Sequence, residues 1–200
     1  MSDAPLIVVI YVAAAVLLVN MYRSDYRAAH VGQSGPKALP GATACGLYGC
    51  IIAVVGALLI LALETGGEIA LGLVGQQSQL MWYFFFAMIA AAVLEEVVFR
   101  GFLVQENKGR VALIASCVGF SLLFAVIHGH FWSTPDGWQW TFSIKAIFTS
   151  GILFLNSLWF YAVRFGPWNP QGSIFPCMLA HAASNLGVYM IKLVQGYIVF

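Results

Sequence analysis

Long apolar segments, each close to the length of a membrane span and separated by short polar breaks, dominate this sequence. A helix needs about 20 apolar residues to cross the hydrocarbon core of a bilayer. Of the 200 residues only 8% are charged, against roughly 25% in an ordinary soluble domain. A soluble fold of this size could not bury so much apolar surface. We therefore predict an all-α, polytopic transmembrane helical bundle, a single integral membrane domain over residues 1–200.

The apolar segments predict about six membrane spans. The breaks between them contain glycine, proline and most of the charge, as loops do. Lys and Arg concentrate in the first, third and fifth breaks, which predicts that both termini face away from the cytoplasm. The formal net charge of +1 gives no field that would attract nucleic acid, so the lipid bilayer is the expected surrounding. The spans are expected at residues 5–22, 43–63, 80–104, 111–128, 142–163 and 174–199.

Two adjacent carboxylates and a guanidinium interrupt the third apolar segment, at Glu95, Glu96 and Arg100. Each charged side chain at the centre of a membrane helix costs about 2.5–3.5 kcal/mol, so such residues are rarely kept without a function. Glu96 and Arg100 are four residues apart, with the acid first, which favours an ion pair along the helix. Glu95 points to another face and has no countercharge of its own. We predict chemistry at Glu95 and a supporting pair of Glu96 and Arg100; the alternative is a salt bridge that only joins helices.

Histidine and asparagine side chains interrupt the fourth and sixth apolar segments. Phe124 and His128 share a helix face at a spacing of four residues, and His130 is expected to be an interfacial residue. His181 and Asn185 have the same spacing, so an imidazole and a carboxamide project together and can donate hydrogen bonds to one oxygen. The alternative is a hydrogen bond between helices, typically worth about 1 kcal/mol.

Together these residues resemble three signatures of the CAAX protease and bacteriocin-processing (CPBP) family of intramembrane glutamic endopeptidases. The signatures occur in order, on separate apolar segments, and the resemblance extends over about residues 90–187. It implies a catalytic core in that region, centred on the third, fourth and sixth helices. The motifs are Glu-Glu-x-x-x-Arg at Glu95, Glu96 and Arg100, Phe-x-x-x-His at Phe124 and His128, and His-x-x-x-Asn at His181 and Asn185.

The resemblance implies hydrolysis of a peptide bond inside the membrane without a covalent intermediate. Glu95, helped by His128, would deprotonate a water, and His181 and Asn185 would stabilise the oxyanion, a role worth about 3–4 kcal/mol per donor. The expected substrate is a membrane-anchored protein or peptide, of a C-terminal processing or sorting type. No cofactor, metal or nucleic acid is expected, and the expected location is the bacterial inner (cell) membrane.

The depths of these residues in the membrane agree for two of the three helices. At 1.5 Å per residue, Glu95 lies about 15 Å and His181 about 12 Å from the nearest loop on one side of the membrane. Counted from Arg110, His128 lies about 27 Å from the same side. We therefore predict that the fourth helix starts later than its apolar pattern indicates, or is strongly tilted.

Three other functions stay open at this point. A zinc-dependent membrane protease would use His128, His181 and one glutamate as ligands, although no His-Glu-x-x-His motif is present, and cleavage that resists chelators would exclude it. A transporter would use the same residues as a proton relay, but the sequence lacks the repeats and broken helix pairs of transporters. A noncatalytic scaffold or immunity protein would keep full activity in cells after Glu95→Gln.

Overall fold

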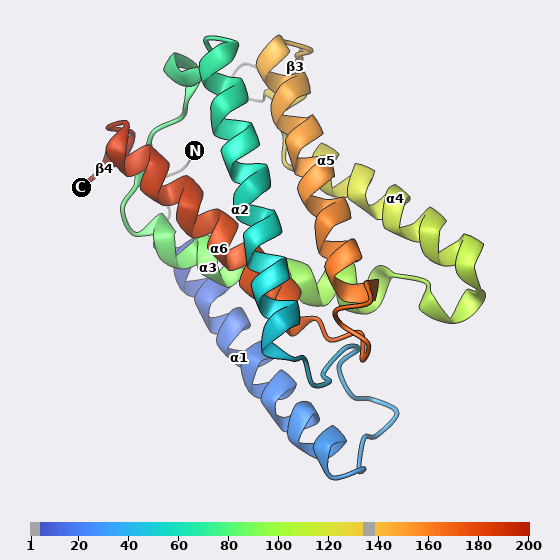
Figure 1. Ribbon diagram of the computed structural model, residues 1–200. Helices are drawn as coiled ribbons and strands as arrows, with labels where there is room; N and C mark the ends of the chain where they lie inside the picture. Colours follow the sequence, from blue (N-terminus) through green and yellow to red (C-terminus); the bar gives the residue numbers. More distant parts are fainter. Residues whose placement is uncertain (1–4, 134–138) are drawn as a thin grey trace.

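The computed structural model describes residues 5–133 and 139–200, and its framework is helical (Figure 1). The α-helices are α1 Pro5–His30, α2 Leu47–Ala70, α3 Phe84–Glu95, α4 Arg110–Ile127, α5 Ile144–Phe165 and α6 Phe175–Val194. Three shorter helical segments are η1 Val74–Gln76, the π-helix η2 Glu96–Leu103 and η3 Glu106–Lys108. Strand β1 Leu80–Met81 pairs in parallel with β4 Ile198–Val199, and β2 Trp132–Ser133 pairs antiparallel with β3 Gln139–Trp140.

Five of these helices, α1, α2, α4, α5 and α6, are long and apolar enough to cross a membrane. The shorter α3 continues directly into η2, so the third predicted span is also a helix without a break. The predicted all-α polytopic bundle is confirmed. Its ends differ from the prediction at α1, which continues to His30, because Tyr22, Tyr26 and His30 stack on one another at successive turns. The last helix ends at Val194, and the chain then turns to form β4.

The third span changes from an α-helix to a wider π-helix at Glu96, where the sequence predicts regular helix to residue 104. A π turn has poorer internal hydrogen bonding, and it is most often found at functional sites where other contacts compensate. Here the hydroxyl of Tyr161 donates to the carbonyl oxygen of Phe99 at 2.9 Å, and Arg100 donates to Ser157 on α5. These contacts hold the wide turn against α5.

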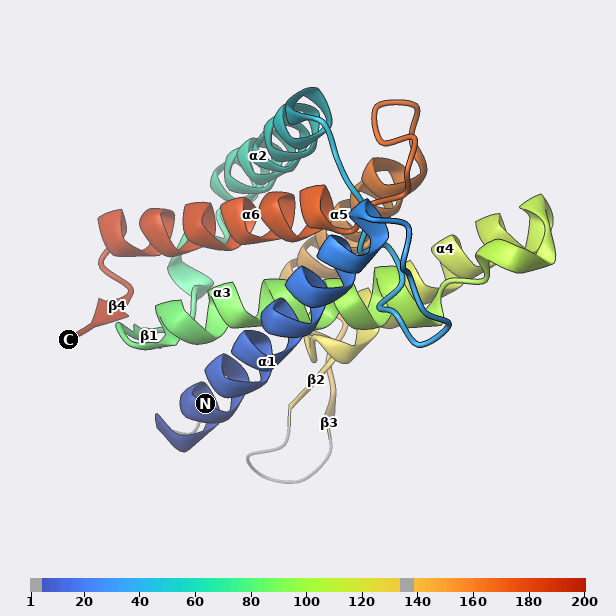
Figure 2. The ribbon, with the colours of Figure 1, turned by 90° about the horizontal axis from the view of Figure 1, so that it is seen from below.

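Helix α3 and its continuation lie in the middle of the bundle, between α1 and α6 (Figure 2). Helix α2 packs along α6, and α4 packs on α5. The contact of α2 with α6 is made by small side chains, since Ala53 and Ala57 are fully buried against Cys177 and Ala180. Small residues of this kind let helix backbones approach closely within a membrane.

Helix α4 begins at Arg110, immediately after Gly109, whose φ of 88° a residue with a side chain rarely adopts. Its start is therefore no later than the apolar pattern indicates, and the first explanation predicted for the depth of His128 was wrong. The second explanation agrees with the structure, because α4 is clearly inclined to α5 in Figures 1 and 2. The inclination brings the C-terminal end of α4 toward α3 and α6.

Candidate active site

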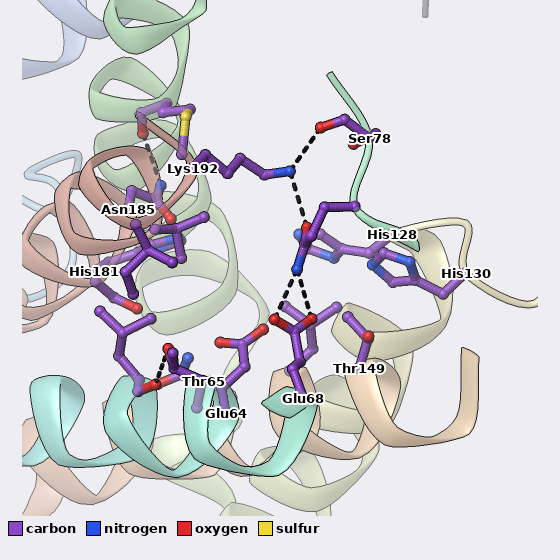
Figure 3. A pocket seen from close by; sticks show the side chains of 18 of the residues that line it. Glu64, Thr65, Glu68, Ser78, His128, His130, Thr149, His181, Asn185 and Lys192 are labelled. Atoms are coloured by element: carbon purple, nitrogen blue, oxygen red, sulfur yellow. Dashed lines mark hydrogen bonds between the residues drawn. The ribbon is translucent and has the colours of Figure 1, made fainter. Parts of the chain in front are cut away.

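A cavity of about 540 Å³ lies between α2, α3, α5 and α6 and the end of α4. All four residues predicted to be catalytic line it, namely Glu95 from α3, His128 from the end of α4, and His181 and Asn185 from α6. Figure 3 shows His128 on one side of the cavity and His181 and Asn185 on the other. The structure thus brings together four polar side chains that are up to 90 positions apart in the sequence.

The imidazole of His181 lies between the two adjacent carboxylates of α3 and η2. Its Nδ1 is 2.8 Å from Oε1 of Glu96, and its Nε2 is 3.7 Å from Oε2 of Glu95. Because a carboxylate only accepts hydrogen bonds, Nδ1 of His181 donates to Glu96, and Nε2 is the nitrogen left to act in the cavity. Oε2 of Glu95 is buried without a hydrogen-bond partner. The arrangement keeps one carboxylate oxygen and one imidazole nitrogen ready for a shared ligand.

Arg100 holds Glu96 in place from the other side. Its guanidinium donates to Oε1 of Glu96 at 3.1 Å, which is the pairing that their spacing predicts, and to the carbonyl and hydroxyl oxygens of Ser157 at 3.0 and 2.7 Å. Both charged side chains are fully buried. A buried guanidinium is also stabilised by the faces of aromatic rings, and four rings lie within 5.8 Å of it: Phe99, Phe124, Phe160 and Tyr161.

Aromatic rings and main-chain carbonyls set the orientation of the histidines and of Asn185. The ring of Phe160 stacks on His181 at 5.1 Å. Nδ1 of His128 donates to the carbonyl of Phe124 at 2.6 Å, which leaves Nε2 of this exposed imidazole free to accept. The amide nitrogen of Asn185 donates to the carbonyl of Met88 at 2.8 Å, so one of its two N–H groups remains for a ligand.

A polar rim that the sequence prediction missed completes the cavity (Figure 3). Glu64 and Glu68 project from α2, where the predicted span had ended at residue 63. Glu68 accepts from the amide of Gln77 at 2.7 Å, and the same amide accepts from Lys192 at 2.9 Å. The sequence signal that could have identified this rim is the pair of carboxylates four residues apart on an apolar helix. Charged residues in an apolar span are rarely kept without a function, which is the argument that singled out Glu95.

His130, predicted to be interfacial, also lines this cavity. It is half-buried, and burial, with smaller effects of the nearby His128 and Lys145, lowers its pKa below the ordinary value of 6.5. His130 is therefore a neutral imidazole at pH 7, able both to donate and to accept a hydrogen bond.

Within residues 5–133 and 139–200, no three His, Cys, Asp or Glu side chains are grouped so that they could hold one metal ion. His181 already donates to Glu96, and His128 already donates to a main-chain carbonyl. Each of these histidines is thus held through Nδ1, and its Nε2 is left without a hydrogen-bond partner of this kind.

Comparison with known families identifies the region that contains this cavity. The family model of the type II CAAX prenyl endopeptidase Rce1-like proteins matches residues 77–187, which is more than half of the chain. The match runs from the loop before α3 into α6 and includes Glu95, His128, His181 and Asn185. No curated protein and no solved structure gives a match. The chain belongs to the Rce1-like family of type II CAAX prenyl endopeptidases, which are membrane proteases.

Proposed function

We propose that this protein is a glutamic-type intramembrane endopeptidase, which hydrolyses a peptide bond of a membrane-anchored protein or peptide. The observation that supports this most directly is the meeting of Glu95, His128, His181 and Asn185 at one cavity, from three helices. Oε2 of Glu95 lies there without a hydrogen-bond partner, 3.7 Å from Nε2 of His181. These contacts support the activation of a water by Glu95 beside an oxyanion site.

In the proposed first step, Glu95 and Nε2 of His128 hold a water molecule in the cavity. The carboxylate of Glu95 takes a proton from this water while its oxygen attacks the carbonyl carbon of the scissile bond. The carbonyl oxygen becomes an oxyanion. The free N–H of Asn185 and an N–H on Nε2 of the His181 imidazolium donate to that oxyanion, and each such donor is worth about 3–4 kcal/mol in studied hydrolases.

In the second step the tetrahedral intermediate collapses and the carbon–nitrogen bond breaks. Glu95 returns its proton to the leaving nitrogen, so the products are a carboxylic acid and an amine, and the enzyme regains its starting state. Glu96 and Arg100 do not touch the substrate in this scheme. Glu96 accepts from Nδ1 of His181 and so fixes the orientation of its ring, and Arg100 holds the buried side chain of Glu96 in place.

We propose as substrates C-terminal processing or sorting segments at the bacterial inner membrane. The family description names a CAAX prenyl endopeptidase, so a prenylated CAAX peptide is the first probe to use in vitro. The catalytic core of about residues 90–187 lies inside one integral membrane domain. Of the remaining helices, α1 packs on α3, and α2 packs on α6 and contributes residues to the wall of the cavity.

The test compares wild type with Glu95→Gln in the native host, by mass spectrometry of membrane-protein termini. We expect at least one terminus that depends on Glu95, because an amide cannot accept the proton of the water. Glu64→Gln is the matched control, since it neutralises another carboxylate of the same cavity that the mechanism does not use. A set of termini that is unchanged in Glu95→Gln would refute the protease proposal and favour a noncatalytic scaffold.

A second measurement separates the proposed mechanism from zinc catalysis by the same residues. Purified protein in lipid vesicles is given a farnesylated peptide that ends in a CAAX sequence, and a peptide that spans the Glu95-dependent terminus. Cleavage is measured before and after dialysis against a strong chelator. We expect unchanged rates, and a rate that falls and returns on adding Zn²⁺ would replace the glutamic mechanism with a metal one.

A further inference from the structure

Helix α5 presents two polar side chains to the catalytic cavity that have no role in the mechanism above. Asn156 lines the cavity with a relative exposure of only 7%, and its Oδ1 is buried without a hydrogen-bond partner. Thr149 lines it too, and its hydroxyl oxygen is likewise buried and unpartnered. Figure 3 shows Thr149 projecting from α5 at the side of the cavity opposite His181. Orphaned buried polar atoms are rare in native proteins, so each calls for an explanation.

These two side chains share one face of α5. Thr149, Leu153 and Asn156 follow at spacings of four and three residues, and all three line the cavity. One further turn along the same face is Phe160, whose ring stacks on His181. Asn156 therefore lies one helical turn from the residue that contacts the imidazole, beside the place where the scissile bond would be held.

A peptide bond that is to be hydrolysed must be taken out of a helix first. Its backbone N–H and C=O groups then lose their internal partners, and in hydrocarbon no water replaces them. The helices around the cavity use most of their backbone groups internally, so the replacements come mainly from side chains. A carboxamide both donates and accepts, and it can rotate about its last torsion to present either atom.

We propose that Asn156, with Thr149, binds the main chain of the substrate next to the scissile bond. The proposal rests on the proposed function and adds a binding site for an extended peptide backbone to it. Seven residues of α-helix rise about 10.5 Å, the length of about three residues of extended chain. Asn156 is then placed near the scissile peptide group, and Thr149 near a peptide group about three residues away, toward the cavity rim.

The test replaces Asn156 with leucine, which has the same number and branching of side-chain heavy atoms but no hydrogen-bonding atoms. Its matched control is Ser150→Ala on the same helix, because Ser150 is 5% exposed, has an equally orphaned hydroxyl, and is not among the residues that line the cavity. The probe is the farnesylated CAAX peptide or, where that peptide is not cut, the peptide that spans the Glu95-dependent terminus. We expect kcat/KM to fall about tenfold in Asn156→Leu and to stay within about twofold in Ser150→Ala.

A set of N-methylated probes tests the contact itself. Each probe carries one methylated peptide nitrogen near the cleavage site, which removes one backbone donor. Methylation of the peptide group that Asn156 contacts should lower the cleavage rate of wild type by about as much as the substitution Asn156→Leu lowers it. The same methylation should hardly change the cleavage rate of the Asn156→Leu protein. A residue that merely supported the fold would not produce this coupling. Equal sensitivity of both proteins to every methylation would overturn the proposal.

Thermal unfolding in lipid nanodiscs tests the proposal without a substrate. Because Oδ1 of Asn156 is buried without a partner in the free protein, leucine should leave the unfolding temperature unchanged or raise it. An unfolding temperature several degrees below wild type would show that Asn156 is a structural residue and would sink the proposal. Failure of the proposed function appears instead as membrane-protein termini that are unchanged in Glu95→Gln, so the two failures are distinguishable.

Discussion

Arg100→Met tests how far the site depends on its buried ion pair. The variant removes a fully buried cation and leaves Glu96, also fully buried, without its countercharge. It also removes two hydrogen bonds to Ser157 and the contacts with four aromatic rings. Charge-assisted hydrogen bonds are worth about 1.5–3 kcal/mol each but do not add independently. Breaking one side of a buried pair costs about 3–5 kcal/mol, and we expect that loss in the free energy of unfolding.

The assay is titration with SDS in mixed micelles, followed by the fluorescence of the tryptophans, for wild type, Arg100→Met and the double variant Glu96→Gln/Arg100→Met. The double variant lacks the unpaired charge of Glu96, because the glutamine is neutral and its oxygen can still accept from His181. It should therefore recover most of the lost stability, to within about 1–2 kcal/mol of wild type. A single variant less than about 1 kcal/mol below wild type, or a double variant no better than the single one, would refute the reasoning.

Two further measurements test the packing and the titration of the described residues. Gly49→Ala should lower the free energy of unfolding by about 1–3 kcal/mol, because its new methyl group would meet the carbonyl oxygen of Trp168 at 2.6 Å. Gly66→Ala on the same helix, where a methyl group would meet nothing within 4 Å, should raise the free energy of unfolding by up to about 1 kcal/mol. Equal effects of the two substitutions would contradict the packing of α2. Burial lowers the pKa of His130 in the folded protein, so the unfolded chain binds more protons, and the free energy of unfolding should fall as the pH drops below about 6.5. His130→Gln should flatten this slope between pH 7.5 and 5.5, and a slope that the substitution leaves unchanged would show that His130 is not its source.

Local spacing made part of the site predictable from the sequence. Glu96 with Arg100, and His181 with Asn185, are one helical turn apart, so their shared faces follow from helix geometry alone. The length of the apolar segments predicted the membrane bundle, since the length that a span requires is set by the thickness of the bilayer alone. These features need no knowledge of how one helix lies on another.

Contacts between helices could not be predicted in this way. The depth of His128 depends on the inclination of α4, and the hydrogen bond of His181 to Glu96 depends on how α6 meets η2. The π turn also escaped prediction, because partners on α5 stabilise it rather than its own residues. The sequence did not single out Asn156, since an asparagine on a membrane helix commonly forms a hydrogen bond to another helix. Only the missing partner of its Oδ1 in the structure distinguishes Asn156 from such a residue.

The ion pair of Glu96 and Arg100 has a consequence for the biogenesis of the protein. Both partners belong to one helix, so the pair forms when this segment coils, before α5 or α6 has entered the membrane. Each charge alone would cost about 2.5–3.5 kcal/mol on insertion, and pairing within the segment reduces that cost at the moment when it arises. A pair shared between two helices would give no such relief until both had been inserted. The third span thus reaches the bilayer with its own counterion, and Ser157 joins it only when α5 packs in place.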